Sequence, residues 1–377
     1  MKFPRIILLM INSFLWQPSF MSFWKSIRYR LPLNMQDFIG HSTLSILNLD
    51  TIGNVQQIKD MTEKQITTLA IENTNICNAN CRFCAYRYQE KPKGFMSNDF
   101  FKQSIKQFAE MGGGALLITP VVGDPLIDKD LINKIRFAKK IKEITYIFLF
   151  TNLIGLNEFN ITDFMSSGLD EINISICIGS REMYKRIFGV DKYRTVINNL
   201  ENLLMENRKL GNKVKVHIHL RAEKPYSSTT SSSDYQYLSK KYARDLFHID
   251  SEYDNWTGII TKNSLPKDNP FKKIKNMSEP CQELYNGAIV FANGDVGGCW
   301  RRDIEGKLVI GNIYENSLND VWRGKNIRMI RQNWIDGKIP SVCKNCFAYE
   351  PLSVFLANAR ARNIRYATFT KSHVSQF

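Results

Sequence analysis

Three cysteines lie close together early in the chain, in the segment Cys77-Asn-Ala-Asn-Cys81-Arg-Phe-Cys84. Three thiolates on one short loop can bind three irons of a [4Fe-4S] cluster, which leaves the fourth iron without a protein ligand. An open coordination position marks a reactive site, as it does in catalytic zinc centres. The alternatives are zinc completed by a distant histidine, and thiols without a joint role. The spacing favours a cluster with one reactive iron.

A second group of cysteines lies near the end of the chain and consists of Cys281, Cys299, Cys343 and Cys346. Asn293-Gly294 stands between apolar stretches and predicts a hairpin turn, which would bring the first two of these cysteines together. Four thiolates can close a [4Fe-4S] cluster completely, so this group favours electron transfer over a reaction at an open iron. A structural zinc ion with four thiolate ligands is the alternative.

The composition is that of a folded protein. The chain has 377 residues, which gives a prior of two domains, and 44% of them are apolar against 23% charged. These fractions allow a sizeable core and exclude wholesale disorder. Eight cysteines are too few for a disulfide scaffold, and only Cys177 lies outside the two groups. We therefore expect a reducing compartment and a cytoplasmic protein.

The chain is basic, with 51 Lys and Arg against 36 Asp and Glu, a net charge of +15. Such a balance suits anionic partners, among them phosphorylated small molecules, nucleic acid and anionic lipid. No block of five or six Lys and Arg residues and no nucleic-acid recognition motif occurs, so we expect no nucleic-acid partner. A nucleic-acid-binding protein with structural zinc is the weakest alternative.

The first residues of the chain contain a short apolar run, Ile6–Ile11. This run is far short of the roughly 20 apolar residues that span a bilayer, and no small-residue cleavage site follows it. The surrounding segment from Phe3 to Leu31 is aromatic and basic. It favours an arm packed on the main domain, with weak peripheral contact with anionic lipid as the alternative.

From residue 67 the chain alternates strand and helix patterns. They predict strands at 67–71, 115–119, 144–150, 171–177 and 214–221, with helices at 98–111, 129–141 and 161–167 and helical stretches up to 210. A Ser/Thr run at 227–233 predicts a loop, and a helix follows at 234–247. Such repeats indicate parallel strands with right-handed crossovers, hence an α/β barrel or open sheet. Reactive groups in these folds gather at the carboxyl ends of the strands, where the cysteine triplet lies.

The triplet after a first strand resembles the radical S-adenosylmethionine (SAM) superfamily, over about residues 67–260. The resemblance implies an α/β fold, a partial (β/α)6 TIM-like barrel, in which the open iron chelates the methionine amino and carboxylate groups of SAM. It implies that Phe83 lies near the adenine. It also implies that the backbone around Gly123 and Asp124 meets the methionine ammonium, although Val122 and Asp124 replace a Gly and a Glu of the family motif.

Three further matches follow later strands. Asn152 belongs to a Thr-Asn-Leu turn that resembles the Thr-Asn-Gly turn of the family, and Ser175 matches a serine at the end of the next strand. Arg221 matches the arginine that can pair with the methionine carboxylate. The cofactor contacts implied by the resemblance are thus Phe83, Gly123, Asp124, Asn152, Ser175 and Arg221. No residue is assigned as a catalytic acid or base.

A second resemblance covers residues 281–346 and is to the SPASM or twitch extension of radical SAM enzymes. It rests on Cys281, on Phe291-Ala-Asn-Gly-Asp-Val-Gly-Gly-Cys299, and on Cys343-Lys-Asn-Cys346. It implies an auxiliary iron-sulfur cluster, and only one, because no cysteine follows Cys346. We therefore expect two [4Fe-4S] clusters and four parts of the chain: an N-terminal extension (1–66), the barrel (67–265), the auxiliary domain (275–350) and a tail (351–377).

The chemistry implied by these resemblances is radical chemistry. Reductive cleavage of SAM would give a 5′-deoxyadenosyl radical that takes hydrogen from a polar small molecule, such as a sugar, an aminocyclitol or a nucleotide-linked compound. If the auxiliary cluster accepts the leftover electron, the net reaction is an oxidation, so we predict a radical SAM oxidoreductase. A low-potential donor such as flavodoxin or ferredoxin would supply the first electron. The alternative is a peptide or protein modifier, the commonest role of SPASM relatives.

Overall fold

The computed structural model describes residues 63, 65–119 and 121–353. The predicted extension 1–66 and tail 351–377 lie almost entirely outside the described residues. The predicted lipid contact of the segment from Phe3 to Leu31 lies wholly outside them. Within the part of the chain that is described, no helix is long and apolar enough to cross a membrane.

Six parallel strands form a curved sheet in the order β6-β5-β4-β3-β2-β1. These strands are β1 (Thr68–Ile71), β2 (Gly114–Ile118), β3 (Ile144–Thr151), β4 (Glu171–Ile176), β5 (Lys215–Arg221) and β6 (Phe247–Asp250). The sheet does not close, because among the described residues β6 pairs with β5 alone. This arrangement confirms the predicted α/β class and the partial barrel.

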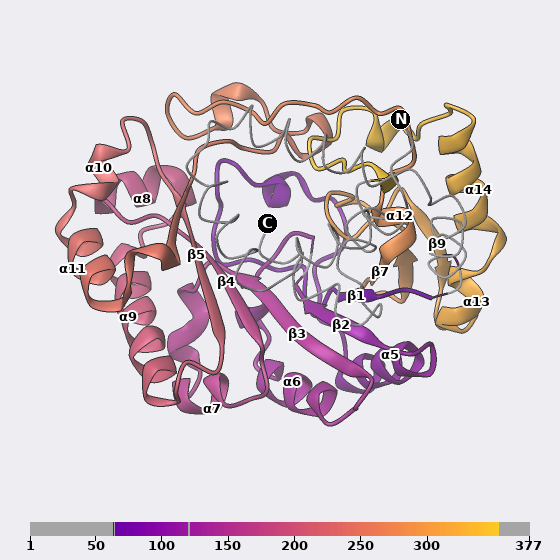
Figure 1. Ribbon diagram of the computed structural model, residues 1–377, viewed down its shortest axis with the longest axis horizontal. Coiled ribbons are helices and arrows are strands. Elements are labelled where there is room, and N and C mark those ends of the chain that lie inside the picture. The colour runs from indigo at the N-terminus through magenta and orange to yellow at the C-terminus, as the bar shows by residue number, and fades with distance from the viewer. Residues whose placement is uncertain (1–62, 64, 120, 354–377) are drawn as a thin grey trace, which may run out of the picture. The chain divides into compact units, whose positions relative to one another are not determined.

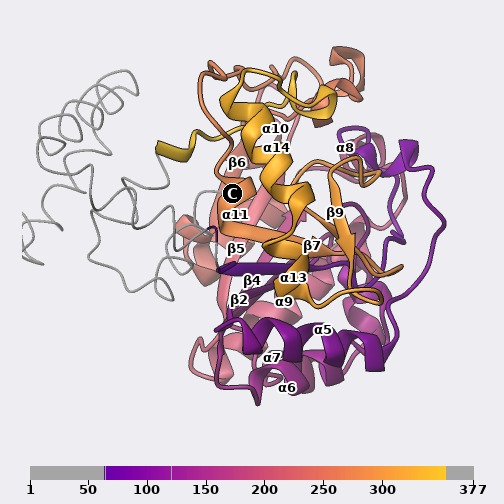
Figure 2. The ribbon, with the colours of Figure 1, turned by 90° about the vertical axis from the view of Figure 1, so that its right-hand side faces the viewer.

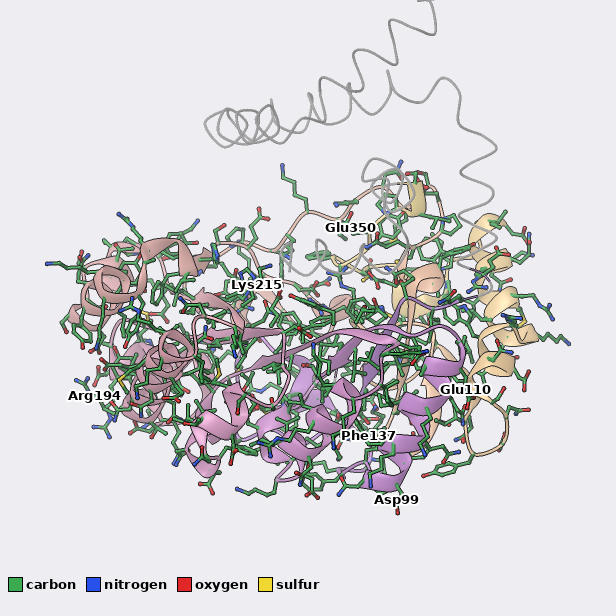
Figure 3. All side chains as sticks on the ribbon, turned by 60° about the horizontal axis from the view of Figure 1, so that its bottom comes forward. Asp99, Glu110, Phe137, Arg194, Lys215 and Glu350 are labelled. Atoms are coloured by element: carbon green, nitrogen blue, oxygen red, sulfur yellow. The ribbon has the colours of Figure 1, made fainter. Side chains whose placement is uncertain are left out.

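Helices cover the outer face of the curved sheet (Figure 1). They are α5 (Asn98–Glu110), α6 (Leu131–Lys139), α7 (Ile161–Met165), α8 (Arg181–Phe188), α9 (Tyr193–Lys209), α10 (Ser227–Thr230) and α11 (Ser233–Tyr242). Ser97 caps α5, since its Oγ accepts the amide of Phe100 at 3.2 Å. Asp99 of α5 and Arg194 of α9, labelled in Figure 3, are exposed on this outer layer.

Short 3-10 turns occupy the connecting loops. They are η2 (Ala85–Tyr88), η3 (Pro125–Ile127), η4 (Ile154–Glu158), η5 (Arg244–Leu246), η6 (Trp256–Gly258), η7 (Lys262–Ser264) and η8 (Ser341–Cys343). Three of them, η2, η3 and η4, directly follow the carboxyl-end loops of β1, β2 and β3. They therefore help to shape the edge of the sheet where the cysteine triplet lies.

Two predictions for the segment after β5 are wrong. The predicted loop at 227–233 contains the helix α10, because the hydroxyls of Ser228 and Thr230 bond back to the carbonyls of Pro225 and Tyr226 and complete a turn. The helix predicted to reach Phe247 ends at Tyr242, where Ala243 adopts a φ of 97°. Residues 247–250 then form β6, a strand that was not predicted and that pairs in parallel with β5.

The C-terminal part continues the same sheet. β7 (Gly287–Val290) pairs in parallel with β1, and β8 (Asp295–Gly297) and β9 (Val309–Asn312) add antiparallel strands, so the described residues form a nine-stranded sheet. The predicted hairpin at Asn293-Gly294 joins β7 to β8, and Gly294 has a φ of 91° that favours glycine. α12 (Glu283–Asn286) leads into β7, and α13 (Leu318–Trp322) and α14 (Lys325–Ile335) pack on β9 (Figure 2).

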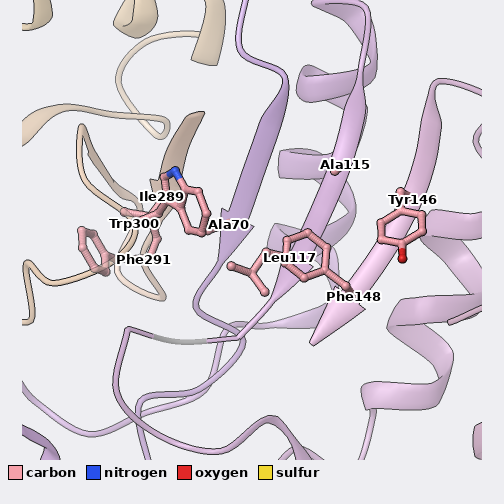
Figure 4. Close-up of a cluster of buried hydrophobic side chains, with 8 residues drawn as sticks. All are labelled: Ala70, Ala115, Leu117, Tyr146, Phe148, Ile289, Phe291 and Trp300. Carbon is pink, nitrogen blue, oxygen red and sulfur yellow. The ribbon is translucent and has the colours of Figure 1, made fainter. Parts of the chain in front are cut away.

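One apolar cluster joins the barrel strands to the C-terminal part (Figure 4). Ala70, Ala115, Leu117, Tyr146 and Phe148 of β1 to β3 are buried in it together with Ile289, Phe291 and Trp300. Burying such side chains contributes about 1.5–3 kcal/mol for each large one, so the cluster holds the two cysteine groups on a common scaffold.

Candidate active site and auxiliary cysteine site

The cysteine triplet lies on the loop that follows β1, at the carboxyl edge of the sheet. The amides of Asn80 and Arg82 donate to the carbonyls of Phe188 and Ile187 at the end of α8, both at 2.9 Å. Gly189 follows with a φ of 70°, and a Cβ on it would lie 2.3 Å from the carbonyl oxygen of Asn80. Glycine at this helix end therefore allows the loop to approach closely.

The three cysteines of this loop are partly buried and lie close together. The amide of Cys84 donates to the carbonyl of Cys81 at 3.2 Å, and the Cys84 sulfur lies 3.5 Å from the amide of Tyr86. Burial raises the pKa of all three thiols, and Cys84 and Cys77 raise the pKa of Cys81 further. Three soft sulfur donors on one loop fit three irons of a cluster, whose binding would displace the thiol protons.

Asp124 ties the loop after β2 to the end of β3. Its buried carboxylate accepts bonds from the Thr151 hydroxyl at 2.9 and 3.0 Å, from the Asn152 amide at 2.7 Å and from the Leu126 amide at 3.0 Å. Burial raises the pKa of Asp124 to about 6 despite these bonds. The neighbouring Gly123 has a φ of 125°. The carboxylate thus shapes the loop, and Gly123 allows its unusual backbone.

Asn152 connects the hydrogen bonds around Asp124 to the cysteine loop. Its Nδ2 donates to Oδ1 of Asn78 at 2.8 Å and lies 3.6 Å from the sulfur of Cys77. Leu153, which stands where the family turn has glycine, adopts a φ of 67°. A left-handed leucine costs about 1–2 kcal/mol, and Asn199 helps to hold it by donating to its carbonyl at 2.9 Å.

Arg221 brings together three of the predicted site residues at the end of β5. Its Nε donates to Ser175 Oγ at 2.9 Å, and its Nη1 lies 2.6 Å from Asp250. Its guanidinium carbon lies 5.0 Å from the centre of the Phe83 ring, a cation–π contact. Burial opposes ionisation of Asp250, yet the charge of Arg221 holds the pKa of that carboxyl below its ordinary value.

Two buried polar atoms near this group have no hydrogen-bond partner among the described residues, the hydroxyl of Tyr253 and the side-chain oxygen of Asn255. The Tyr253 ring lies 5.6 Å from both the Phe83 ring and the Arg221 guanidinium carbon. Unpaired buried groups cost about 1–3 kcal/mol each, which a polar ligand could recover. The residues at this edge therefore fit a ligand that carries charged and hydroxyl groups, as SAM does.

The second cysteine group is assembled from three separate parts of the chain. Cys281 precedes α12, Cys299 follows β8, and the last pair follows α14. The four cysteines line one cavity, whose other walls include Leu284, Leu308, Trp334 and Tyr349. Burial raises the pKa of all four thiols, to about 12 for Cys299. Four sulfurs around an apolar cavity fit a fully ligated cluster.

A zinc ion is the alternative for this second group. In the described part of the chain, no three His, Cys, Asp or Glu side chains are placed to hold a single metal ion.

Three residues near the cysteine groups escaped sequence reasoning, namely Asp250, Tyr253 and Arg302. Nε of Arg302 lies 3.1 Å from Oδ2 of Asp254. Its position three residues after Cys299 could have indicated a residue near the auxiliary site. Asp250 and Tyr253 were missed because no strand was predicted at 247–250.

Comparison with known protein families gives two matches. Residues 71–223 match the radical SAM superfamily, and residues 281–347 match the SPASM family, described as an iron-sulfur cluster-binding domain. The first range contains the cysteine triplet, and the second contains the other four grouped cysteines.

Curated relatives of similar sequence are named GTP 3′,8-cyclase. The protein of Pasteurella multocida (strain Pm70) is 27% identical over 153 residues, which are 40% of this chain and 44% of the relative. The probable GTP 3′,8-cyclase of Archaeoglobus fulgidus is 29% identical over 144 residues, which are 38% of this chain and 47% of the relative. The matches span less than half the length of these relatives.

Two solved structures share the fold. BtrN in complex with AdoMet and 2-DOIA has a TM-score of 0.51 at 18% identity and covers 77% of this chain and 96% of its own. SuiB of Streptococcus suis bound to precursor peptide SuiA has a TM-score of 0.55 at 13% identity, with 80% and 76% covered. These likenesses concern the fold, while the two family matches contain all seven grouped cysteines. The chain therefore belongs to the radical SAM superfamily, whose chemistry uses SAM and iron-sulfur clusters, and it carries a C-terminal SPASM iron-sulfur domain.

Proposed function

We propose that this protein is a radical SAM oxidoreductase that holds two [4Fe-4S] clusters and oxidises a polar small molecule. The observation that carries the proposal is the division of seven cysteines into a triplet on one loop and a set of four around a cavity. Cys77, Cys81 and Cys84 would hold the cluster that binds SAM. The other four would hold an auxiliary cluster without an open iron.

The residues around the triplet would bind SAM. Arg221 would pair with the methionine carboxylate, while its bonds to Ser175 and Asp250 fix the guanidinium plane. Phe83 would lie near the adenine, and Gly123, Asp124 and Asn152 would line the methionine end. When bound, the reduced cluster and SAM supply a 5′-deoxyadenosyl radical.

A row of polar side chains across β3 to β5 supports a polar substrate. The Tyr146 hydroxyl and the Asn173 Nδ2 donate to the buried carboxylate of Glu171 at 2.7 and 2.9 Å, and His219 Nε2 lies 3.4 Å from Asn173 Oδ1. On β4 and β5 these side chains share the face of Ser175 and Arg221, because side chains alternate along a strand. Hydroxyl or amino groups of a substrate could form hydrogen bonds with these side chains.

In the proposed oxidation a carbinol would lose one hydrogen atom to the 5′-deoxyadenosyl radical and then one electron and one proton, and it would become a ketone. The four-cysteine site would hold the acceptor of that electron, because four protein ligands leave no iron free for substrate. The neighbour solved with AdoMet and 2-DOIA and the relatives named GTP 3′,8-cyclase support a small or nucleotide-linked substrate.

A second candidate function is modification of a peptide. It is favoured by the fold likeness to SuiB, which was solved with the precursor peptide SuiA. Both candidates use the same radical step, so substrate screening decides between them.

We also propose the setting in which the enzyme works. Seven grouped thiols require reducing conditions, which supports a cytoplasmic location. Flavodoxin or ferredoxin would supply the low-potential electron. The barrel would comprise residues 67–265 and the auxiliary domain 275–350.

The test combines metal analysis with turnover under anaerobic conditions. After reconstitution we expect about eight irons and eight sulfides per chain, whereas about four irons with one zinc would overturn the two-cluster proposal. With dithionite and SAM, we expect release of 5′-deoxyadenosine, which Cys81→Ala should abolish. Sugars, aminocyclitols and nucleotides are then compared with peptides for stimulation of that release. A response to peptides alone would replace the small-molecule proposal.

A further inference from the structure

A tryptophan and an arginine form a small contact layer next to both cysteine sites. The indole Nε1 of Trp256 donates to the backbone carbonyl of Phe83 at 2.9 Å, directly beside Cys84. The guanidinium carbon of Arg302 lies 4.5 Å from the centre of the same indole. Arg302 also follows Cys299 by three residues, so this pair links the triplet loop to the auxiliary site.

Asp254 holds both members of this pair in place. Its Oδ1 accepts the Trp256 amide at 2.6 Å, and its Oδ2 lies 3.1 Å from Nε of Arg302. Trp256 has a φ of 50°, a conformation that L residues rarely adopt and that this carboxylate bond supports. The guanidinium is thus fixed on two sides, by an ion pair and by an aromatic ring.

Apolar packing closes the same region. Ala85, Val122 and Ile304 are buried together, and Cys84, Trp256 and Ile259 pack against them. Ile304 belongs to the segment after Cys299, whereas Cys84 and Ala85 belong to the triplet loop. The Arg302 side chain is 23% exposed, so water is partly excluded around it and its charge acts over a longer distance than a charge in bulk water.

Arg302 is connected to both sets of cysteines. It follows Cys299 by three residues, and its stacking partner Trp256 bonds the backbone carbonyl of Phe83, the residue before Cys84. Arg301 differs, because it pairs with buried Glu283 at 3.0 Å beside the auxiliary cavity. Arg301 lines the auxiliary cavity itself, whereas Arg302 stacks on the indole that bonds the triplet loop.

We propose that Arg302 is a positioning residue shared by the two cluster sites, whose fixed guanidinium stabilises the reduced form of the cluster at each and so raises both reduction potentials. The proposal rests on the two-cluster function proposed above. A cluster gains one negative charge on reduction, and a nearby cation therefore favours that state. Lysine could not reproduce the effect fully, because it lacks the planar group that stacks on Trp256 while pairing with Asp254.

The test is an EPR-monitored redox titration of the reconstituted full-length protein. The two clusters are told apart by adding SAM, which should change only the signal of the triplet-bound cluster. We expect Arg302→Gln to lower both midpoint potentials and Arg302→Lys to lower them less. Arg301→Gln, the matched control, should lower the auxiliary potential alone. Trp256→Phe keeps a ring under the guanidinium and should change both potentials least.

The outcomes separate this proposal from the function on which it rests. Eight irons per chain with both potentials unchanged in Arg302→Gln, or with only one changed, would overturn the shared role and leave the proposed function intact. Iron at one site only would overturn both proposals. Circular dichroism and iron content equal to those of the unsubstituted protein show that a shift in potential does not come from misfolding.

Discussion

The two cysteine sites use the same ligand chemistry in contrasting surroundings. The triplet lies on one loop at the edge of the sheet, among groups that can bond a ligand, such as Arg221, Asn152 and the unpartnered hydroxyl of Tyr253. The set of four is gathered from distant segments around a cavity with apolar walls such as Leu308 and Trp334. The triplet site therefore offers polar groups to a ligand, whereas the set of four surrounds a cavity with mostly apolar walls.

This contrast shows that the surroundings of a cysteine group carry more functional information than the number of cysteines. Burial raises the thiol pKa at both sites, so thiol chemistry alone does not separate them. The triplet has Arg221 and the unpartnered hydroxyl of Tyr253 beside it. Beside the set of four, Glu283 and Arg301 pair with each other and Trp334 stacks on Tyr349 at 5.6 Å.

Removing one cysteine from each site tests whether the two sites have separate roles. We expect Cys81→Ala to reduce 5′-deoxyadenosine release to background, because the reactive iron would lose its cluster. Cys299→Ala should keep SAM cleavage and lose product formation. Chromatography of both products and iron counts check this result. Equal loss of SAM cleavage in the two variants would mean that the sites do not have separate roles.

Removing the iron should disturb the two sites unequally. The auxiliary site has little regular structure around its last two cysteines, so metal binding there supplies folding free energy. The triplet loop is also held by the backbone bonds from Asn80 and Arg82 to α8. Hydrogen exchange of the iron-free protein should therefore show larger loss of protection at 341–349 than at 78–84. The reverse pattern would contradict the comparison.

The buried carboxyl of Asp124 beside the triplet should make the free energy of unfolding depend on pH. The pKa of Asp124 is about 6 in the folded protein against an ordinary value of 3.8, so the folded state binds this proton more tightly than the unfolded state. The resulting stability is fully present below pH 3.8 and is lost as the pH rises through 6, on the order of 3 kcal/mol.

Urea unfolding of the anaerobic protein between pH 3.5 and 7 would measure this dependence, on the order of 3 kcal/mol. Asp124→Asn should remove it, and Asp99→Asn, a change at an exposed residue of α5, should leave it unchanged. If Asp124→Asn leaves the pH profile unchanged, the pH dependence of the free energy of unfolding does not come from the Asp124 carboxyl.

The smallest expected effect concerns two glycines, one near each site. Gly189→Ala should cost about 2 kcal/mol, because φ is 70° and the new Cβ would meet the Asn80 carbonyl. Gly298→Ala, beside Cys299, should cost much less, since its nearest contact would be 3.4 Å from Ile327. Melting temperatures and iron content of the two variants test this difference. A larger loss at Gly298 would mean that the auxiliary loop is the tighter one.

Much of the barrel could be predicted because its signals are local. The continuous apolar run at 144–150 and the alternating run at 214–221 became β3 and β5 almost unchanged, and Ser97 capped α5. The grouping of the cysteines could also be predicted, because close spacing within one loop limits how far apart the thiols can lie. The roles of the predicted cofactor-binding residues stay predictions, although the structure places Phe83, Ser175 and Arg221 in one contact group.

The features that escaped prediction depend on partners far apart in sequence. β6 is a short strand that only its pairing with β5 identifies, so Asp250 was not recognised as a site residue. The parallel pairing of β7 with β1 has no local signal at all. Arg302 reads as an ordinary surface charge until the fold brings it against Trp256.

The pairing of β1 with β7 also has a consequence for biosynthesis. The hydroxyl of Thr67 bonds the carbonyl of Asn286 across 219 residues, so one edge of the strand that leads to the triplet stays unpaired until the last quarter of the chain leaves the ribosome. An open strand edge can pair with other nascent chains. A protein truncated before residue 287 would keep that edge exposed, and it should accumulate as insoluble aggregates rather than as a working barrel.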